Sequence, residues 1–100
     1  MIIREKIALD TARPFIKVVV DISRKILAYG CELHIDCAEE LLGDGSLQKD
    51  LWGANVYPEK KEIDFISLIN IRPQESNRSM KIERPEIRKA VEDVMQALLF

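Results

Sequence analysis

Residues 85–99 carry a helical pattern of apolar side chains. The apolar positions of this stripe are Ile87, Val91, Val94, Met95 and Leu98. All of them fall on one face of an α-helix, and Pro85 suits its first turn. A helix with one apolar face must bury it against another layer, and the β-branched runs upstream supply a sheet. We therefore predict an α+β fold: a single, mostly antiparallel sheet of about five strands with a C-terminal amphipathic helix packed on it.

Residues 15–29 fit two different structures. Apolar residues at positions 15, 18, 19, 22, 26 and 29 would form a helical stripe that ends at Gly30. The β-branched run Val18–Ile22, followed by a polar turn, instead indicates two antiparallel strands. These strands would span Ile16–Ile22 and Lys25–Ile35. We favour the hairpin, although a short apolar run does not exclude the helix.

The other expected elements come from shorter patterns. Ile63–Ile71 is almost continuously apolar, which is typical of a central strand covered on both faces. It would pair with Trp52–Tyr57 as a hairpin. Ile2–Ile7 and Ser79–Ile82 read as short strands, and a short helix should start at Asp36 and end at Gly43.

The segment Gly30–Cys37 alternates apolar and polar residues one by one. As a strand it would place both cysteines on one face and the polar residues on the other. The polar face would carry three candidate catalytic residues, Glu32, His34 and Asp36. A histidine between two carboxylates can act as a general base, whereas the same stripe on a wet edge strand would have no catalytic role.

The same segment does not predict a metal site or another cofactor. Cys31, His34 and Cys37 have ligand chemistry, but a strand points His34 away from both cysteines, and the chain has no further cysteine or histidine. The same geometry disfavours a thiol nucleophile. We expect two buried, reduced cysteines, because the first residues show no export signal and disulfides are rare in the cytosol.

A second set of polar and aromatic residues lies in and beside the predicted strands and forms the candidate ligand-binding group. Arg72 comes directly after a predicted central strand and could hold a carboxylate or phosphate, or could form a structural ion pair with Glu32 or Asp36. The group comprises Asp50, Trp52, Asn55, Tyr57, Asn70, Arg72, Asn77 and Arg78.

Composition sets limits on the function. A chain of 100 residues, 47% hydrophobic and 32% charged, is one globular domain over residues 1–100. The net charge of −2 makes nucleic acid an unsuitable partner, and no apolar run is long enough for a membrane span. Acids gather between residues 32 and 50 and bases between 72 and 89. The glycine-rich phosphate loop, the GxSxG elbow and basic-aromatic RNA-binding signatures are absent.

With these residues laid out, the chain resembles a small family of prokaryotic proteins of about this length, known only as a domain of unknown function. The resemblance rests on VVDI (19–22), GCELHID (30–36), DLWGANVYP (50–58), SLINIRP (67–73) and NRSM (77–80). It implies a cytosolic bacterial protein with an α+β sheet, and it implies no activity.

The sequence contains no complete catalytic set. We therefore expect a non-enzymatic binding or interaction module in the cytoplasm. It would be a homodimer, or bind a small protein partner, through edge strands and the apolar end Leu98–Phe100. A small anionic ligand is also compatible with the arginines. The alternative is a small hydrolase or nuclease-like enzyme that uses His34 with Glu32 or Asp36, and Arg72 or Arg78 as the anion-binding group.

Overall fold

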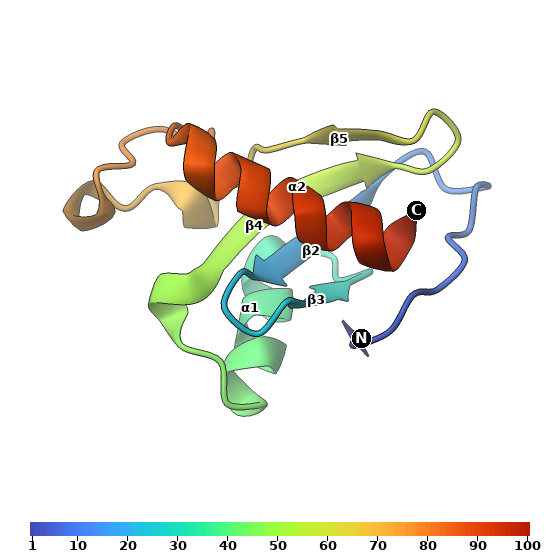
Figure 1. Cartoon of the computed structure of the whole chain (residues 1–100), viewed down its shortest axis with the longest axis horizontal. Coiled ribbons are helices and arrows are strands. Elements are labelled where there is room, and N and C mark those ends of the chain that lie inside the picture. Colours follow the sequence, from blue (N-terminus) through green and yellow to red (C-terminus); the bar gives the residue numbers. More distant parts are fainter.

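The computed structural model describes residues 1–100 and has one antiparallel sheet of five strands with a helix on each face (Figure 1). The strand order is β1-β3-β2-β4-β5, so β2 is the central strand. The strands are β1 (Ile2–Ile3), β2 (Ile16–Asp21), β3 (Ile26–Tyr29), β4 (Leu51–Tyr57) and β5 (Glu62–Asp64). The helices are α1 (His34–Gly43) and α2 (Pro85–Leu99), with short 3-10 helices η1 (Gln48–Asp50), η2 (Leu68–Asn70) and η3 (Pro73–Glu75). The predicted α+β class is confirmed.

Residues 16–29 form the hairpin and not the helix. Strands β2 and β3 are antiparallel, with Asp21 opposite Ile26. The Asp21 carboxylate stabilises the turn, because its Oδ1 accepts hydrogen bonds from the backbone N–H groups of Ser23 and Arg24, each at 2.9 Å. The second strand is shorter than predicted, since β3 ends at Tyr29.

The C-terminal helix has the predicted bounds and buries the predicted face. It lies across one face of the sheet (Figure 1), where Val18, Val20, Trp52 and Val56 pack with Val91 and Met95 in a cluster of 15 buried residues. These strand positions are spaced by two, so they share a face of the sheet. This cluster is the main core of the protein.

The segment 30–37 is not a strand, contrary to the prediction. Residues 31–33 are irregular, and α1 begins at His34, on the opposite face of the sheet from α2 (Figure 1). Cys37, Ala38 and Leu41 form the buried stripe of α1, with Val19 and Ala28 beneath them. The alternating pattern was misleading, because Leu33 and Ile35 do not reach the core. They are 56% and 47% exposed, at the start of a helix.

The prediction of a central strand over Ile63–Ile71 is also wrong. Only Glu62–Asp64 is a strand, and it lies at the edge, where it pairs with β4 as the predicted hairpin. The chain then leaves the sheet and makes a single bridge between Ile66 and Lys81, which is all that remains of the predicted strand Ser79–Ile82. The predicted strand Ile2–Ile7 is likewise reduced to β1.

Candidate functional site: a groove between helix α1 and residues 66–72

Asn70 explains why residues 66–72 leave the sheet and yet stay close to it. Its side chain occupies the free edge of β4: Oδ1 accepts from the Gly53 N–H at 2.8 Å, and Nδ2 donates to the Gly53 carbonyl at 2.9 Å. The carboxamide thus takes the place of a neighbouring strand. The approach needs glycine, because a Cβ at position 53 would lie 2.4 Å from the Cβ of Ser67.

Asn77 holds the rest of this loop. Its Nδ2 donates to the carbonyl oxygens of Asn70, Ser79 and Lys81, and its Oδ1 accepts from the Glu83 N–H. Both asparagines are fully buried. Asn70 and Asn77 were predicted to bind a ligand, but the structure places their polar groups on the backbone, where they shape the loop.

The loop and α1 together form a groove made of two adjoining hollows that share Ile35 and Ile69. One hollow, of about 350 Å³, lies beside the start of α1, and the other, of about 230 Å³, beside its end. The first is lined by Lys17, Leu33, His34, Ile35, Ile66, Ser67, Leu68, Ile69 and Met80. The second is lined by Ile35, Ala38, Glu39, Leu42, Gln48, Leu51, Ile69 and Arg72. We call these two hollows the α1 groove.

The α1 groove contains most of the exposed large hydrophobic side chains of the protein. Ten large hydrophobic side chains are exposed, and six of them line the groove. These six are Leu33, Ile35, Leu42, Ile66, Leu68 and Met80. Leu68, at 73% exposed, is the most exposed of all ten. Contiguous exposed apolar surface on a small domain is typical of interaction sites.

Arg72 lies in the wall of the groove and is almost completely buried, with 6% exposed. Its guanidinium stacks on the Trp52 ring, 3.8 Å from the centroid. Nη1 donates to the Gln48 carbonyl at 2.9 Å and Nη2 to the Leu51 carbonyl at 2.5 Å. The structural ion pair with Glu32 or Asp36 is not formed, because no carboxylate lies within 4 Å of this guanidinium. Burial lowers the pKa of Arg72 from its ordinary value.

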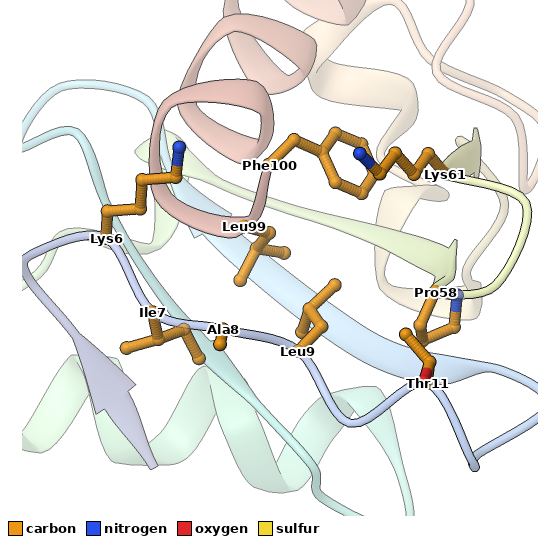
Figure 2. Close-up of a pocket in the computed structure, with 9 residues that line it drawn as sticks. All are labelled: Lys6, Ile7, Ala8, Leu9, Thr11, Pro58, Lys61, Leu99 and Phe100. Carbon is orange, nitrogen blue, oxygen red and sulfur yellow. The ribbon is translucent and has the colours of Figure 1, made fainter.

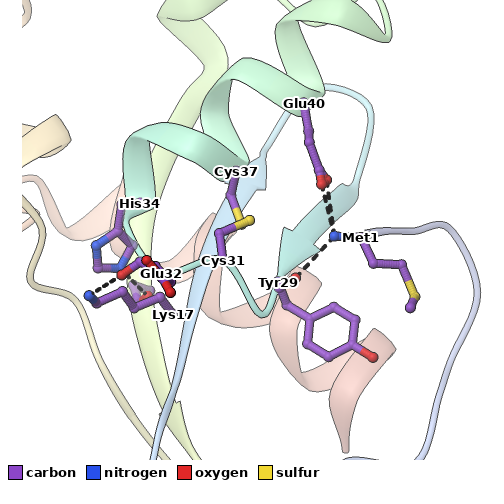
Figure 3. Close-up of a disulfide and its surroundings, with 9 residues drawn as sticks. Met1, Lys17, Tyr29, Cys31, Glu32, His34, Cys37 and Glu40 are labelled. Atoms are coloured by element: carbon purple, nitrogen blue, oxygen red, sulfur yellow. Dashed lines mark hydrogen bonds and ion pairs between the residues drawn. A yellow bond between two sulfur atoms is a disulfide. The ribbon is translucent and has the colours of Figure 1, made fainter.

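Figure 3 shows the Cys31–Cys37 pair together with Glu32 and His34 of the predicted catalytic stripe. Cys31 and Cys37 form a disulfide across six positions, so the expectation of reduced cysteines is wrong. His34 bonds the Ala54 carbonyl through Nε2 at 2.9 Å, and its burial lowers its pKa. The carbonyl of Glu32 accepts from the Lys17 ammonium, while its side chain borders a separate hollow with Arg13 and Phe15.

The structure therefore does not place Glu32, His34 and Asp36 on one face. His34 and Asp36 are two positions apart on α1, and residues at that spacing do not face each other. Glu32 precedes the helix and is exposed. The catalytic role of these three residues stays a prediction, but the shared strand face that motivated it does not exist.

The other candidate ligand residues lie outside the groove wall. Asn55 Nδ2 and the Tyr57 hydroxyl donate to the two carboxylate oxygens of Asp64 at 2.7 and 2.8 Å. The carboxylate raises the pKa of Tyr57. Asp50 pairs with Lys49 at 3.7 Å, and the exposed side chain of Arg78 forms no ion pair. These contacts bind parts of the chain to one another.

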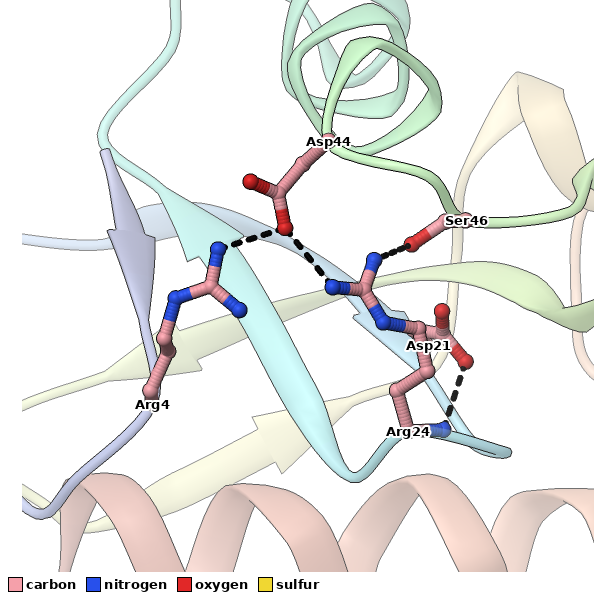
Figure 4. A network of polar contacts seen from close by, with 5 residues as sticks. All are labelled: Arg4, Asp21, Arg24, Asp44 and Ser46. Carbon is pink, nitrogen blue, oxygen red and sulfur yellow. Dashed lines mark hydrogen bonds and ion pairs between the residues drawn. The ribbon is translucent and has the colours of Figure 1, made fainter.

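Two further features lie outside the α1 groove: the contacts of Asp44 and a hollow at the end of α2. Asp44 accepts hydrogen bonds from Arg4 at 2.5 Å and from Arg24 at 2.8 Å. These contacts, drawn in Figure 4, tie the end of α1 to the residue after β1 and to the β2–β3 turn. The two arginines lower the pKa of Asp44. A hollow of about 510 Å³ lies where Leu99 and Phe100 meet residues 6–9 and Thr11. Figure 2 shows the side chains that line it.

The end of α2 is already covered. Leu98 and Leu99 are buried, and the Ile7 N–H donates to the Leu98 carbonyl at 2.9 Å. Leu98 and Leu99 of the apolar end that was predicted as a pairing surface therefore belong to the core, while Phe100 is partly buried against it. The edge strands are short as well, with two residues in β1 and three in β5, which limits pairing with another sheet edge.

No cluster of three or more His, Cys, Asp or Glu side chains is arranged to hold a metal ion. Neither helix has the length and apolar character needed to cross a membrane. The fold and site thus define a small α+β domain with a partly apolar groove on one sheet face. The chain belongs to the family described as protein of unknown function (DUF5674), whose model matches residues 2–98. No curated protein and no solved structure matches the chain.

Sequence reasoning missed the apolar groove residues because it assigned them to the core. Leu33 and Ile35 alternate with polar residues, whereas Ile66 and Leu68 lie in an almost continuously apolar run, and both patterns predict strands. One signal could have identified the loop: Ser67 and Asn70 interrupt an otherwise apolar run, and serine and asparagine side chains compete for backbone hydrogen bonds.

Proposed function

We propose that the protein is a non-enzymatic binding module that holds an apolar segment of a partner protein in the α1 groove. The observation that carries this proposal is the concentration of six of the ten exposed large hydrophobic residues along one groove. Burying a leucine or isoleucine side chain stabilises a complex by about 1.5–3 kcal/mol before the cost of association. A partner segment that covers several of these residues would bind specifically.

The construction of the groove supports this proposal. The loop between β5 and α2 spans residues 65–84 and has little regular structure, which in a compact domain usually indicates function. Two fully buried asparagines and a required glycine nevertheless fix it against β4. A groove that is already formed loses little conformational freedom on binding.

Charge supports a protein segment with at least one acidic residue as the occupant. The groove carries a cation at each end, Lys17 and Arg72, against a single acid, Glu39. Homodimerisation stays a prediction. The surfaces from which we predicted it offer little contact area, since the edge strands are short and Leu98 and Leu99 are buried.

A random peptide library displayed on phage and selected against the immobilised protein tests the proposal. We expect enriched peptides with two or more large apolar residues, and fluorescence anisotropy should show that Ile35→Ser and Leu68→Ser each weaken their binding at least tenfold. Phe15→Ser is the matched control, because Phe15 is an exposed apolar residue outside the groove. Failure to enrich peptides, or equal binding by all variants, would overturn the proposal. A dimer in sedimentation that Leu68→Ser dissociates would replace the partner segment by a second copy.

The cytoplasmic location expected from the sequence is part of this proposal. Disulfides are rare in reducing compartments, so the Cys31–Cys37 disulfide of the structure provides a test of this location. Acid-quenched thiol counting on protein taken directly from fractionated cells tests this. Recovery of the protein in the cytosolic fraction supports the cytoplasm, and a disulfide-bonded protein found only outside that fraction contradicts it.

A further inference from the structure

We infer that Arg72 forms a carboxylate subsite in the part of the α1 groove bordered by Leu42 and Gln48. This inference rests on the proposed function and names the chemistry of the occupant: an apolar side chain next to a carboxylate. The carboxylate would be an acidic side chain or the C-terminus of the partner segment.

The first argument is the number of unused donors on Arg72. A guanidinium has five N–H groups. Two of them reach the carbonyls of Gln48 and Leu51, one from each Nη, and Nε has no partner although it is buried. Each Nη therefore keeps one N–H unused. Buried polar groups in proteins are nearly always paired, so a buried Nε–H without a partner is unusual.

The second argument is that no carboxylate pairs directly with the buried charge of Arg72, and Glu75 acts on this charge only from beyond 4 Å. Arg72 is 6% exposed. A buried ion is costly unless an opposite charge pairs with it. Stacking on Trp52 and two carbonyl contacts offset part of that cost. An incoming carboxylate would supply the missing counterion in a place where water screens the attraction poorly.

The third argument is the shape and lining of the hollow, which favour a carboxylate over a phosphate. The hollow of about 230 Å³ is lined mainly by apolar side chains, with Arg72 as its single cation. Glu39 also borders it and would repel a doubly charged phosphate more strongly than a singly charged group. A planar carboxylate matches the fork of a guanidinium, and the apolar walls fit a branched aliphatic chain beside it.

Isovalerate and isovaleramide are suitable probes, because they share a branched chain and differ only in the charged group. The ¹⁵N–¹H signals of arginine Nε groups report contact directly. We expect isovalerate to shift the Arg72 Nε–H signal and to bind at least tenfold more tightly than isovaleramide. The Arg78 signal should not move, since that arginine is exposed outside the groove. Equal binding of the two probes, or no shift at Arg72, would overturn the inference.

A second measurement keeps the inference falsifiable if Arg72 variants do not fold. In peptides selected for groove binding, we expect Asp→Asn or Glu→Gln, or amidation of the C-terminus, to weaken binding to the unchanged protein at least tenfold. Arg72→Lys, where it folds, should lose most of this discrimination, because lysine lacks the fork. Peptides that bind the groove equally well without any carboxylate would refute the subsite and leave the proposed function standing.

Discussion

The two faces of the sheet differ in how completely they are covered. On one face, the 15-residue helix α2 closes a cluster of 15 buried residues that includes Trp52 and Met95. On the other face, the 10-residue helix α1 covers a cluster of seven, and the groove beside it leaves six large hydrophobic residues exposed. A completely covered face stabilises the fold by burying its apolar side chains. An incompletely covered face leaves apolar side chains in water and offers a surface for binding.

The difference also separates two ways of holding an element in place. Helix α2 is held by apolar packing over its whole length. The α1 face depends on discrete links: the Cys31–Cys37 disulfide, the Asp44 ion pairs and the Asn70 carboxamide. Changes on the α2 face should therefore lower global stability, and changes on the α1 face should act locally.

The largest effect should come from the α2 face. Met95→Ala removes a fully buried side chain from the main core and should lower the free energy of unfolding by about 2–5 kcal/mol. Urea denaturation followed by tryptophan fluorescence measures this loss. Met80→Ala is the matched control, because Met80 is exposed in the groove and should lose far less. Equal losses in the two variants would contradict the contrast between the faces.

The next largest effect should come from Asn70→Ala. This change leaves the Gly53 N–H and C=O and the Met80 carbonyl without their side-chain partner, and it should cost about 2–3 kcal/mol. Hydrogen exchange should rise sharply at Gly53 and in residues 66–72, while α2 keeps its protection. Gln74→Ala, an exposed amide of the same loop, should have no such effect. Uniform loss of protection across the chain would show that the loop and the core unfold together.

The sequence predicted the elements that are regular and covered. Helix 85–99 has the predicted bounds. The prediction succeeded because the five apolar positions that indicated one helix face are all buried in the structure. The β2–β3 hairpin followed from Val18–Val20 and a polar turn. Periodicity is informative there because side chains on one face of a regular element share one environment.

The candidate site could not be predicted in the same way. Four apolar residues of the groove are exposed to solvent, namely Leu33, Ile35, Ile66 and Leu68. Their spacing in the sequence therefore does not correspond to a buried face. The hydrogen bonds of Asn70 and Asn77 join residues up to 17 positions apart, and no local pattern indicates such partners. Arg72 was identified as a candidate anion-binding residue, and its burial against Trp52 was not.

The disulfide should have an intermediate effect confined to α1. Closing a loop of about seven residues stabilises a protein by about 2 kcal/mol in the chain-entropy description. The double variant Cys31→Ser/Cys37→Ser should lose about this amount in urea denaturation, and exchange at residues 31–38 should increase. Reduction of the parent protein with dithiothreitol should reproduce the loss and leave the double variant unchanged. A reduced protein as stable as the oxidised one would show that packing alone holds the start of α1.

A smaller effect should follow the titration of His34. Burial lowers its pKa in the folded protein, so the unfolded chain takes up the proton first. Neutral His34 contributes fully to the free energy of unfolding above pH 6.5, the pKa of the histidine in the unfolded chain. This contribution is lost as the pH falls toward the lower pKa of the folded protein. The melting temperature should therefore fall between pH 7.5 and pH 5.5. His34→Gln should flatten this dependence, and an unchanged slope in that variant would assign it to other groups.

The smallest effect on stability should come from Leu68→Ser, and it is the sharpest test of the comparison. Leu68 is 73% exposed, so the folded protein gains little from it, and the free energy of unfolding should change by less than about 0.5 kcal/mol. A residue kept only for the fold would have no reason to be leucine there, because its exposed side chain adds to aggregation risk. If Leu68→Ser instead costs several kcal/mol, the loop packs more tightly in solution and the α1 groove is part of the core. Unchanged stability together with lost peptide binding would separate the binding face from the stabilising one.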